Sequence, residues 1–217
     1  MKRGGRTMKH ATTRELYDYW NRLRGSARAP LRSAIEPSDI RRILSETFIL
    51  EVGGRDDYFV RLAGTRVCAL YCRELKGSNL LDLWAGEDRS AMATLAAAVS
   101  EDGAGAVLTL AAETADEREV ACEMLLLPLR HGGEIFNRVL GSCVALERPY
   151  WLGTEAVVRQ RITSLRLIWP EEAPRYLRRR TDQPAAVLPL EGRPPIRFPI
   201  SGSRQHGHLF VVDGGKQ

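Results

Sequence analysis

The feature that most constrains this fold is a run of three apolar segments joined by short turns, at residues 106–112, 118–129 and 136–146. The first link contains Asp116-Glu117 and the second Gly132-Gly133, which are typical turn residues. Strands joined so closely pair in antiparallel fashion. We therefore predict an antiparallel meander at the centre of the fold.

The residues upstream of this meander predict two further strands and a long helix. The strands, at 48–52 and 58–62, flank a Gly-rich link, and a helical turn at 66–73 and a short apolar segment at 80–84 follow. Helix 87–100 has an acidic first turn, the apolar stripe Met92, Leu95, Ala96 and Val99, and Gly103 as a terminator. The order of elements indicates an α+β fold with helices on one face of a sheet.

Two helices are expected near the N-terminus. Helix 13–23 has a capping box formed by Thr12 and Glu15, with Trp20 on its apolar face. A short helix that starts at Pro37 is expected to bury Ile40, Ile43 and Leu44. Residues 162–169 fit either a sixth strand or a short helix, and the apolar segment at 208–213 fits an edge strand.

Charge is unevenly distributed along the 217 residues. The net charge is +5 overall, but it is +4 in residues 1–10, −5 in residues 11–147 and +6 in residues 148–217. Prolines are frequent after Trp169 and break regular elements. We divide the chain into a basic disordered arm (1–10), a folded domain (11–169) and a Pro/Arg-rich tail (170–217).

Several motifs resemble those of PAS_5, a bacterial PAS-like family that was formerly a domain of unknown function. The resemblance covers about residues 13–169, and its motif positions are Trp20, Pro37, Arg61, Gly64, Thr65 and Gly77, followed by Leu126–Leu129 and Arg138–Gly141. It implies a five-stranded antiparallel sheet with helices on one face. It also implies a sensory or protein-interaction module that holds a small ligand between sheet and helices, or that dimerises through the N-terminal helix.

The pocket residues that the resemblance implies are Arg61, Cys68, Tyr71, Cys72, Trp84 and Met92. Each also has a purely architectural interpretation. Arg61 fits a hydrogen bond to loop carbonyls or a carboxylate, and Gly64 fits a backbone shape that other residues resist. Cys68 and Cys72 share a helix face, where Arg66 and Arg73 would activate a thiol, but buried packing is the favoured interpretation because free cysteine is among the most buried residue types.

The tail contains an arginine cluster that predicts anion binding. Arg175, Arg178, Arg179 and Arg180 lie within six residues, a pattern that fits phosphates on nucleic acid, lipid or a nucleotide, although a solvated run is the favoured interpretation. No known nucleic-acid-binding motif accompanies the cluster, so binding to nucleic acid or an anionic surface is the alternative function.

Other functions are disfavoured by missing signals. No nucleophile elbow, zinc-protease motif, phosphate loop or dinucleotide fingerprint occurs, so we do not expect an enzyme. No histidine lies where a haem ligand is expected, the flavin-adduct motif is missing, and no metal site is predicted. No apolar run approaches the roughly 18 residues of a membrane span.

The main hypothesis is therefore a cytoplasmic, stand-alone regulatory PAS module that acts through a protein partner or as a homodimer using the Trp20 helix. Whether a small molecule gates it stays open, and the sequence names no cofactor.

Overall fold

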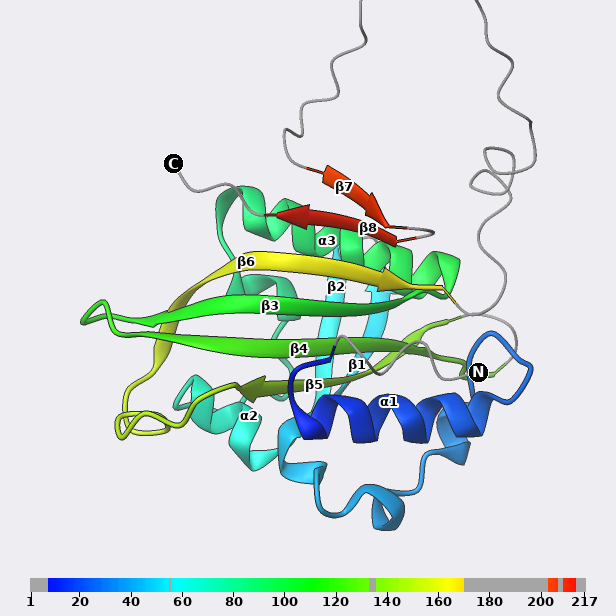
Figure 1. Cartoon of the computed structure of the whole chain (residues 1–217). Coiled ribbons are helices and arrows are strands. Elements are labelled where there is room, and N and C mark those ends of the chain that lie inside the picture. The colour runs from blue at the N-terminus through cyan, green and yellow to red at the C-terminus, as the bar shows by residue number, and fades with distance from the viewer. Residues whose placement is uncertain (1–7, 55, 133–135, 170–202, 207–208, 214–217) are drawn as a thin grey trace, which may run out of the picture.

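The computed structural model describes residues 8–54, 56–132, 136–169, 203–206 and 209–213, and for the last two ranges the backbone alone. One antiparallel sheet forms the centre of this part of the chain (Figure 1). Its strands are β1 (Thr47–Gly54), β2 (Asp57–Ala63), β3 (Gly105–Thr114), β4 (Glu119–Leu129), β5 (Arg138–Ala145), β6 (Val157–Ile168), β7 (Ser203–His206) and β8 (Leu209–Asp213).

The strand order is β2-β1-β5-β4-β3-β6-β8-β7. The chain leaves β2 at one edge and passes through helices before it enters β3 on the far side of β4 and β5. The first five strands are the predicted PAS-like sheet, which is confirmed. Residues 162–169, for which a strand and a short helix were both expected, belong to strand β6 up to Ile168. Strand β8 pairs with β6 at Ser164 and Leu165.

Helical segments cover both faces of the sheet (Figure 1). The α-helices are α1 (Ala11–Arg24), α2 (Thr65–Leu70) and α3 (Gly86–Asp102), and the short 3-10 turns are η2 (Arg32–Ala34), η3 (Pro37–Ile40), η4 (Leu44–Glu46) and η5 (Leu80–Leu83). α2, η5 and α3 pack against one face, as predicted, whereas α1 crosses the opposite face in front of β4 and β5.

The alternation of side chains along the strands creates two separate cores. On β1, Phe48 faces α2 and α3, and its neighbour Ile49 faces α1. On β3, Leu108 likewise lies in the core beneath α2 and α3, and its neighbour Val107 lies in the core beneath α1. Because neighbouring residues of a strand point to opposite faces, a strand between two helical layers must be apolar throughout. This explains the long apolar runs of β3 and β4.

Helix α3 matches its sequence pattern closely. Met92, Leu95, Ala96 and Val99 are all buried and form the predicted stripe. Gly103 ends the helix in the left-handed conformation with φ of 71°, which glycine adopts at little cost.

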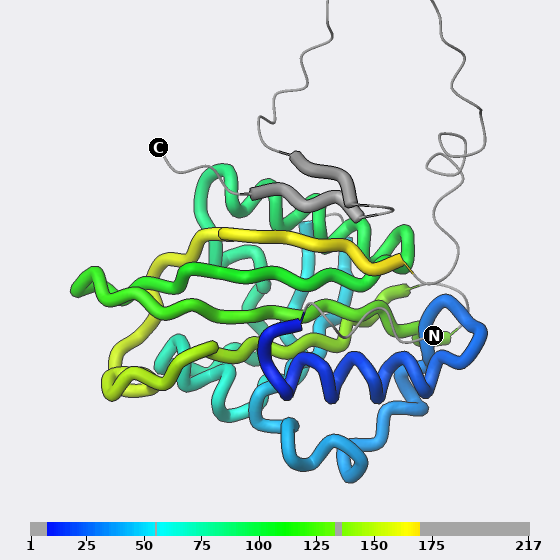
Figure 2. Tube along the Cα trace, in the orientation of Figure 1, coloured from blue at the N-terminus to red at the C-terminus, as the bar shows by residue number. Residues whose placement is uncertain are grey.

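Helix α1 runs beside β4 and β5 (Figure 2), and its apolar residues belong to the core on that face of the sheet. Leu16, Tyr19 and Trp20 are at most 3% exposed, and the Trp20 indole N–H donates a 2.8 Å hydrogen bond to the Pro128 carbonyl. Fully burying a large apolar side chain stabilises by roughly 1.5–3 kcal/mol, so these three contribute about 5–9 kcal/mol. The surface expected to form a dimer is therefore already occupied within the same chain.

Three expectations about the N-terminal region need correction. The N-cap of α1 is His10, whose imidazole accepts a hydrogen bond from the Thr12 N–H, so the capping box with Thr12 is wrong. Met8, which was expected to lie in the disordered arm, is 3% exposed and packs in the core beside α1. Leu44 is 41% exposed and is not part of the core.

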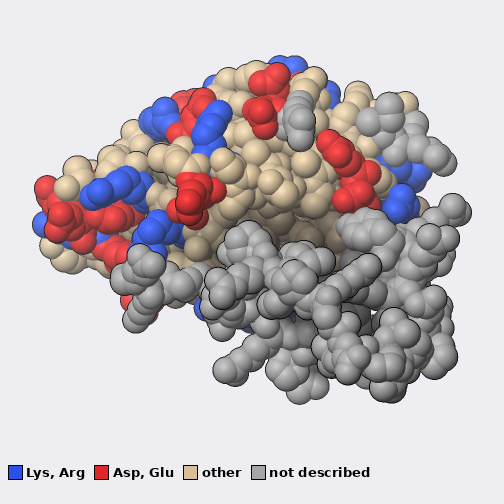
Figure 3. Space-filling model, turned by 90° about the horizontal axis from the view of Figure 1, so that it is seen from above, with Lys and Arg blue, Asp and Glu red and all other residues tan. Residues whose placement is uncertain are grey.

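Ion pairs cover the end of the sheet where the β3–β4 hairpin protrudes. Arg159 pairs with Glu113 at 2.7 Å, and Arg161 pairs with Glu119 at 3.2 Å. Figure 3 shows acidic and basic side chains side by side at this end. Arginines of the basic C-terminal region thus neutralise part of the acidic domain. Within the described part of the chain, no helix has the length and apolar character needed to cross a membrane.

Gly64 brings η4 against the start of α2. Its backbone is ordinary, with φ of −70° and ψ of 156°, so the expectation of an unusual backbone shape is wrong. The reason for glycine is close approach: an added Cβ would lie 2.3 Å from the Ser45 carbonyl oxygen and 2.4 Å from that of Leu44. The Gly64 N–H also donates to the Thr47 carbonyl at 2.8 Å.

We expect Gly64→Ala to lower the free energy of unfolding by about 3 kcal/mol or more, because two backbone carbonyls would have to move. Gly54→Ala is the matched control, since its Cβ would meet Asp57 Oδ2 at an ordinary 3.4 Å. Urea unfolding of both variants measures the effect. Equal stability of the two variants would contradict the close-approach explanation.

Candidate functional site

A buried carboxylate, Glu46, lies where η4, α1 and α2 meet. The Thr12 hydroxyl of α1 donates a hydrogen bond to its Oε2, and the Arg66 guanidinium of α2 donates to its Oε1 at 2.7 Å. Arg148, which follows β5, approaches the same Oε1 at 3.7 Å. Three segments that are distant in sequence therefore converge on one side chain that is only 8% exposed.

Glu46 is charged at neutral pH. Burial by itself raises the pKa of this carboxyl group, but the hydrogen bonds from Thr12 and Arg66 and the positive charge of Arg66 outweigh burial. The net result is a pKa below the ordinary value for glutamate. The site thus combines one fixed negative charge with two arginine side chains that are 54% and 68% exposed.

A cavity of about 190 Å³ opens beside these charged groups. Its walls come from α2, β5 and the segment that follows β5, and they are mostly apolar. The lining residues are Glu46, Arg66, Ala69, Leu70, Cys143, Val144, Ala145, Arg148, Leu152 and Gly153. The cavity therefore has an apolar floor and a charged rim.

A polar group lies in the core near the cavity wall. The buried Tyr71 hydroxyl donates a 3.1 Å hydrogen bond to Gln160 Oε1, and burial raises the pKa of Tyr71 well above its usual value. A hydrogen bond with Cys122, together with burial, likewise raises the pKa of Cys143. These groups are neutral at physiological pH, and protonated thiols are poor nucleophiles.

Comparison with known proteins identifies the family. The model of PAS_5, described as a PAS domain, matches residues 8–144, more than half of the chain. The protein belongs to this PAS domain family. The match begins at Met8, a residue that is buried in the core of the structure.

Solved light-oxygen-voltage domains are similar to this PAS domain over part of its length. One, from work with a flavin analogue on the mechanism of such domains, is 18% identical with a TM-score of 0.41, covering 52% of this chain and 87% of that one. Another is an RNA-binding light-oxygen-voltage receptor, 17% identical with a TM-score of 0.41, covering 57% of this chain and 35% of the receptor. No curated protein matches the sequence.

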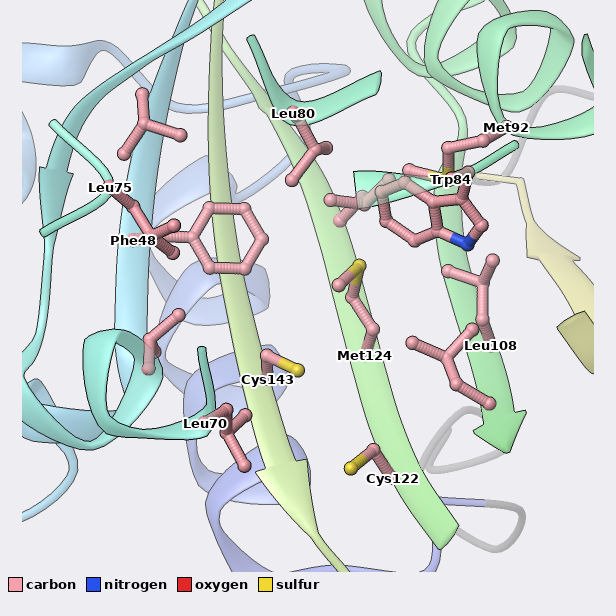
Figure 4. Close-up of a cluster of buried hydrophobic side chains, with 14 of the residues drawn as sticks. Phe48, Leu70, Leu75, Leu80, Trp84, Met92, Leu108, Cys122, Met124 and Cys143 are labelled. Atoms are coloured by element: carbon pink, nitrogen blue, oxygen red, sulfur yellow. The ribbon is translucent and has the colours of Figure 1, made fainter. Parts of the chain in front are cut away.

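The structure brings together three of the pocket residues expected from sequence. Tyr71, Trp84 and Met92 lie in the core between the sheet and α2, η5 and α3. Figure 4 shows Trp84 and Met92 packed over Leu108 and Met124. Side chains thus fill the centre of this PAS domain, and the cavity lies to one side of it.

The other expected pocket residues lie elsewhere. Arg61 is 61% exposed on β2 and pairs with Glu51. Cys72 is exposed, and Cys68 is partly buried. Burial raises the pKa of Cys68, and the nearby Arg66 pairs with Glu46, so an activated thiol at Cys68 is not supported.

Sequence reasoning missed Glu46 and Arg148. A lone acidic residue immediately before a buried strand was the available signal for Glu46, since such a carboxylate must find partners. Arg148 had no local signal. The cluster Arg175, Arg178, Arg179 and Arg180 lies outside the described residues. Among the described residues, no group of three metal-ligating side chains gathers.

A flavin or a haem does not fit this cavity. Pockets for drug-sized ligands span roughly 300–1,000 Å³, and the space here is about 190 Å³. The centre of the domain is filled by side chains such as Met92, which is fully buried. The residues present suit a smaller molecule.

Two neighbouring threonines test the junction at Glu46. We expect Thr12→Val to lower the free energy of unfolding by about 1–3 kcal/mol, because it removes a donor from a buried carboxylate. Thr13→Val is the control: Thr13 is fully buried, and its hydroxyl has no partner among the described residues. In urea unfolding, Thr13→Val should leave the free energy of unfolding unchanged or raise it. An equal loss of stability in the two variants would contradict the role of the Thr12 hydroxyl as a donor to Glu46.

Acid should weaken the same junction. The pKa of Glu46 is lower in the native state than in the unfolded state, where it is about 4.3. The charged carboxylate therefore stabilises the fold fully above that unfolded pKa, and this stabilisation is lost as pH falls through the native pKa. We expect Glu46→Gln to be less stable than wild type at pH 7, with a difference that narrows below about pH 4. A difference that stays constant down to pH 2 would contradict a charged Glu46.

Proposed function

We propose that this PAS domain is a regulatory, non-catalytic sensory module that acts through protein–protein contacts and is gated by a small ligand in the cavity beside Glu46. The observation that carries the proposal is that one carboxylate joins the cavity rim to the first turn of α1, through Arg66 on one side and Thr12 on the other. A ligand that draws Arg66 or Arg148 away from Glu46 changes the environment of Thr12.

The first turn of α1 is the part of the domain suited to change. A small ligand typically contributes about 1–3 kcal/mol of coupling between two sites. This is less than the roughly 5–9 kcal/mol that anchors Leu16, Tyr19 and Trp20, so the whole helix stays on the sheet. The residues immediately before α1 are held to the sheet by Glu123, which accepts hydrogen bonds from the N–H groups of Lys9 at 2.7 Å and His10 at 2.9 Å.

This limits how the protein binds partners. Dimerisation through the apolar face of the Trp20 helix would require that helix to leave the sheet. We therefore propose that the start of α1 and the residues before it present the signal to a partner, which can be a second copy of the chain.

The matched threonine variants also test the function. Thr12→Val removes the hydrogen bond between α1 and Glu46, so we expect it to change the affinity of the protein for its partner, or for a second copy of itself, at least threefold. Thr13→Val should leave this affinity unchanged. The measurements are sedimentation velocity of the full chain and quantitative affinity capture with each variant from native cells. Identical association for wild type and both variants would contradict the proposal.

Binding to nucleic acid or an anionic surface is the second candidate. Most of the basic residues that it needs lie outside the described part of the chain, including Lys2, Arg3 and Arg6 of the arm and the cluster Arg175, Arg178, Arg179 and Arg180 of the tail. Arg148, Arg159 and Arg161 of the basic C-terminal region pair with acidic residues of the domain instead. The alternative therefore stays a prediction that depends on the remaining basic residues.

A further inference from the structure

We propose that the cavity binds a small monocarboxylate with a short apolar tail, and that Arg66 and Arg148 hold its carboxylate group. This inference rests on the proposed function, and it names the class of ligand. It is carried by the charge of the rim, the free donors on the two guanidinium groups, and the size and character of the walls.

The rim selects a single negative charge. Arg66 and Arg148 carry two positive charges and Glu46 one negative charge, so the net charge of the rim is +1. A monoanion neutralises this charge, whereas a dianionic phosphate would add repulsion with Glu46. An amine is repelled by the net positive charge, and Glu46 is already engaged by Thr12 and Arg66.

The two arginines are placed to share one carboxylate. Arg66 Nη1 and Arg148 Nη2 approach the same oxygen of Glu46, at 2.7 and 3.7 Å. Each guanidinium has five N–H donors in a planar fork that matches a carboxylate. Since each uses one nitrogen toward Glu46 and both groups are more than half exposed, donors remain at the mouth of the cavity.

The walls determine the tail of the ligand. Leu70, Val144 and Leu152 provide apolar surface, and the small residues Ala69 and Gly153 leave room between them. The cavity volume of about 190 Å³ is below the roughly 300–1,000 Å³ of pockets for drug-sized ligands. It therefore takes an unbranched carboxylic acid of about four to six carbons, with the carboxylate at the rim.

Binding has a consequence for the junction. A ligand carboxylate competes with Glu46 for Arg66 and Arg148, so Glu46 loses part of its positive surroundings. The hydrogen bond from Thr12 must then change in strength or geometry. This is the step that links the ligand class to the first turn of α1.

The test is calorimetric titration of the full-length protein with acetate, butanoate, pentanoate and octanoate. We expect affinity to rise about fourfold for each CH₂ group from acetate to pentanoate, following burial of about 0.8 kcal/mol per group, and to fall for octanoate. Butanol, butylamine and butyl phosphate should bind at least tenfold more weakly than butanoate.

Two exposed arginines provide a matched pair of variants. Arg148→Gln removes a rim charge and should weaken pentanoate binding at least about fivefold. Arg159→Gln removes an arginine of similar exposure from an ion pair with Glu113, away from the cavity, and should leave binding unchanged. Because both side chains are more than 60% exposed, both variants are expected to fold, which thermal melting verifies.

Three results would overturn the ligand class: no carboxylate binding at millimolar concentration, butanol binding as tightly as butanoate, or unchanged affinity in Arg148→Gln. If butyl phosphate binds more tightly than butanoate, the ligand class is a phosphate and the carboxylate proposal is wrong. Failure of the proposed function is distinguishable from these results. If pentanoate binds but neither amide exchange at Lys9 and His10 nor partner association responds, the ligand site stands and the gating fails.

Discussion

The carboxylate of Glu46, shared between Thr12 and Arg66, is the interaction on which the arrangement around the cavity depends. A charged group with so little exposure is costly unless several donors surround it. The fold supplies those donors from α1, from α2 and from Arg148, three residues after the end of β5. Gly64 makes the arrangement possible, since only a residue without a Cβ lets the start of α2 approach the backbone of η4 so closely. The same contacts define the cavity and connect it to the N-terminal helix.

The charge distribution gains a structural meaning from the sheet. The acidic central region and the basic C-terminal region are not independent, because strand β6 carries Arg159 and Arg161 alongside Glu113 of β3 and Glu119 of β4. Exposed pairs of this kind contribute little to stability individually. Their effect is to neutralise part of the charge at this end of the sheet, whereas two arginines meet a single glutamate at the rim of the cavity.

Local patterns in the sequence were sufficient for most elements of the fold. The stripe of α3 and its stop at Gly103, the meander of β3 to β5 and the start of η3 at Pro37 all follow from short-range rules of periodicity and turn chemistry. Local rules failed where a side chain had a distant partner. Thr12 has the residue type and position of an N-cap, but its hydroxyl is used by Glu46, and His10 caps the helix instead. Leu44 has the spacing of a core residue, yet it faces solvent.

The sequence by itself determined the PAS-like order of elements and the family, because both are written in local periodicity and in motifs of a few residues. Only the tertiary structure decided that side chains fill the centre of the domain and that α1 packs its apolar face against its own sheet. It also decided that Glu46, Arg66 and Arg148 meet at a cavity. These residues are separated by 20 to 102 positions in the chain. Their encounter depends on strand order and on one close backbone contact, which no short-range pattern encodes.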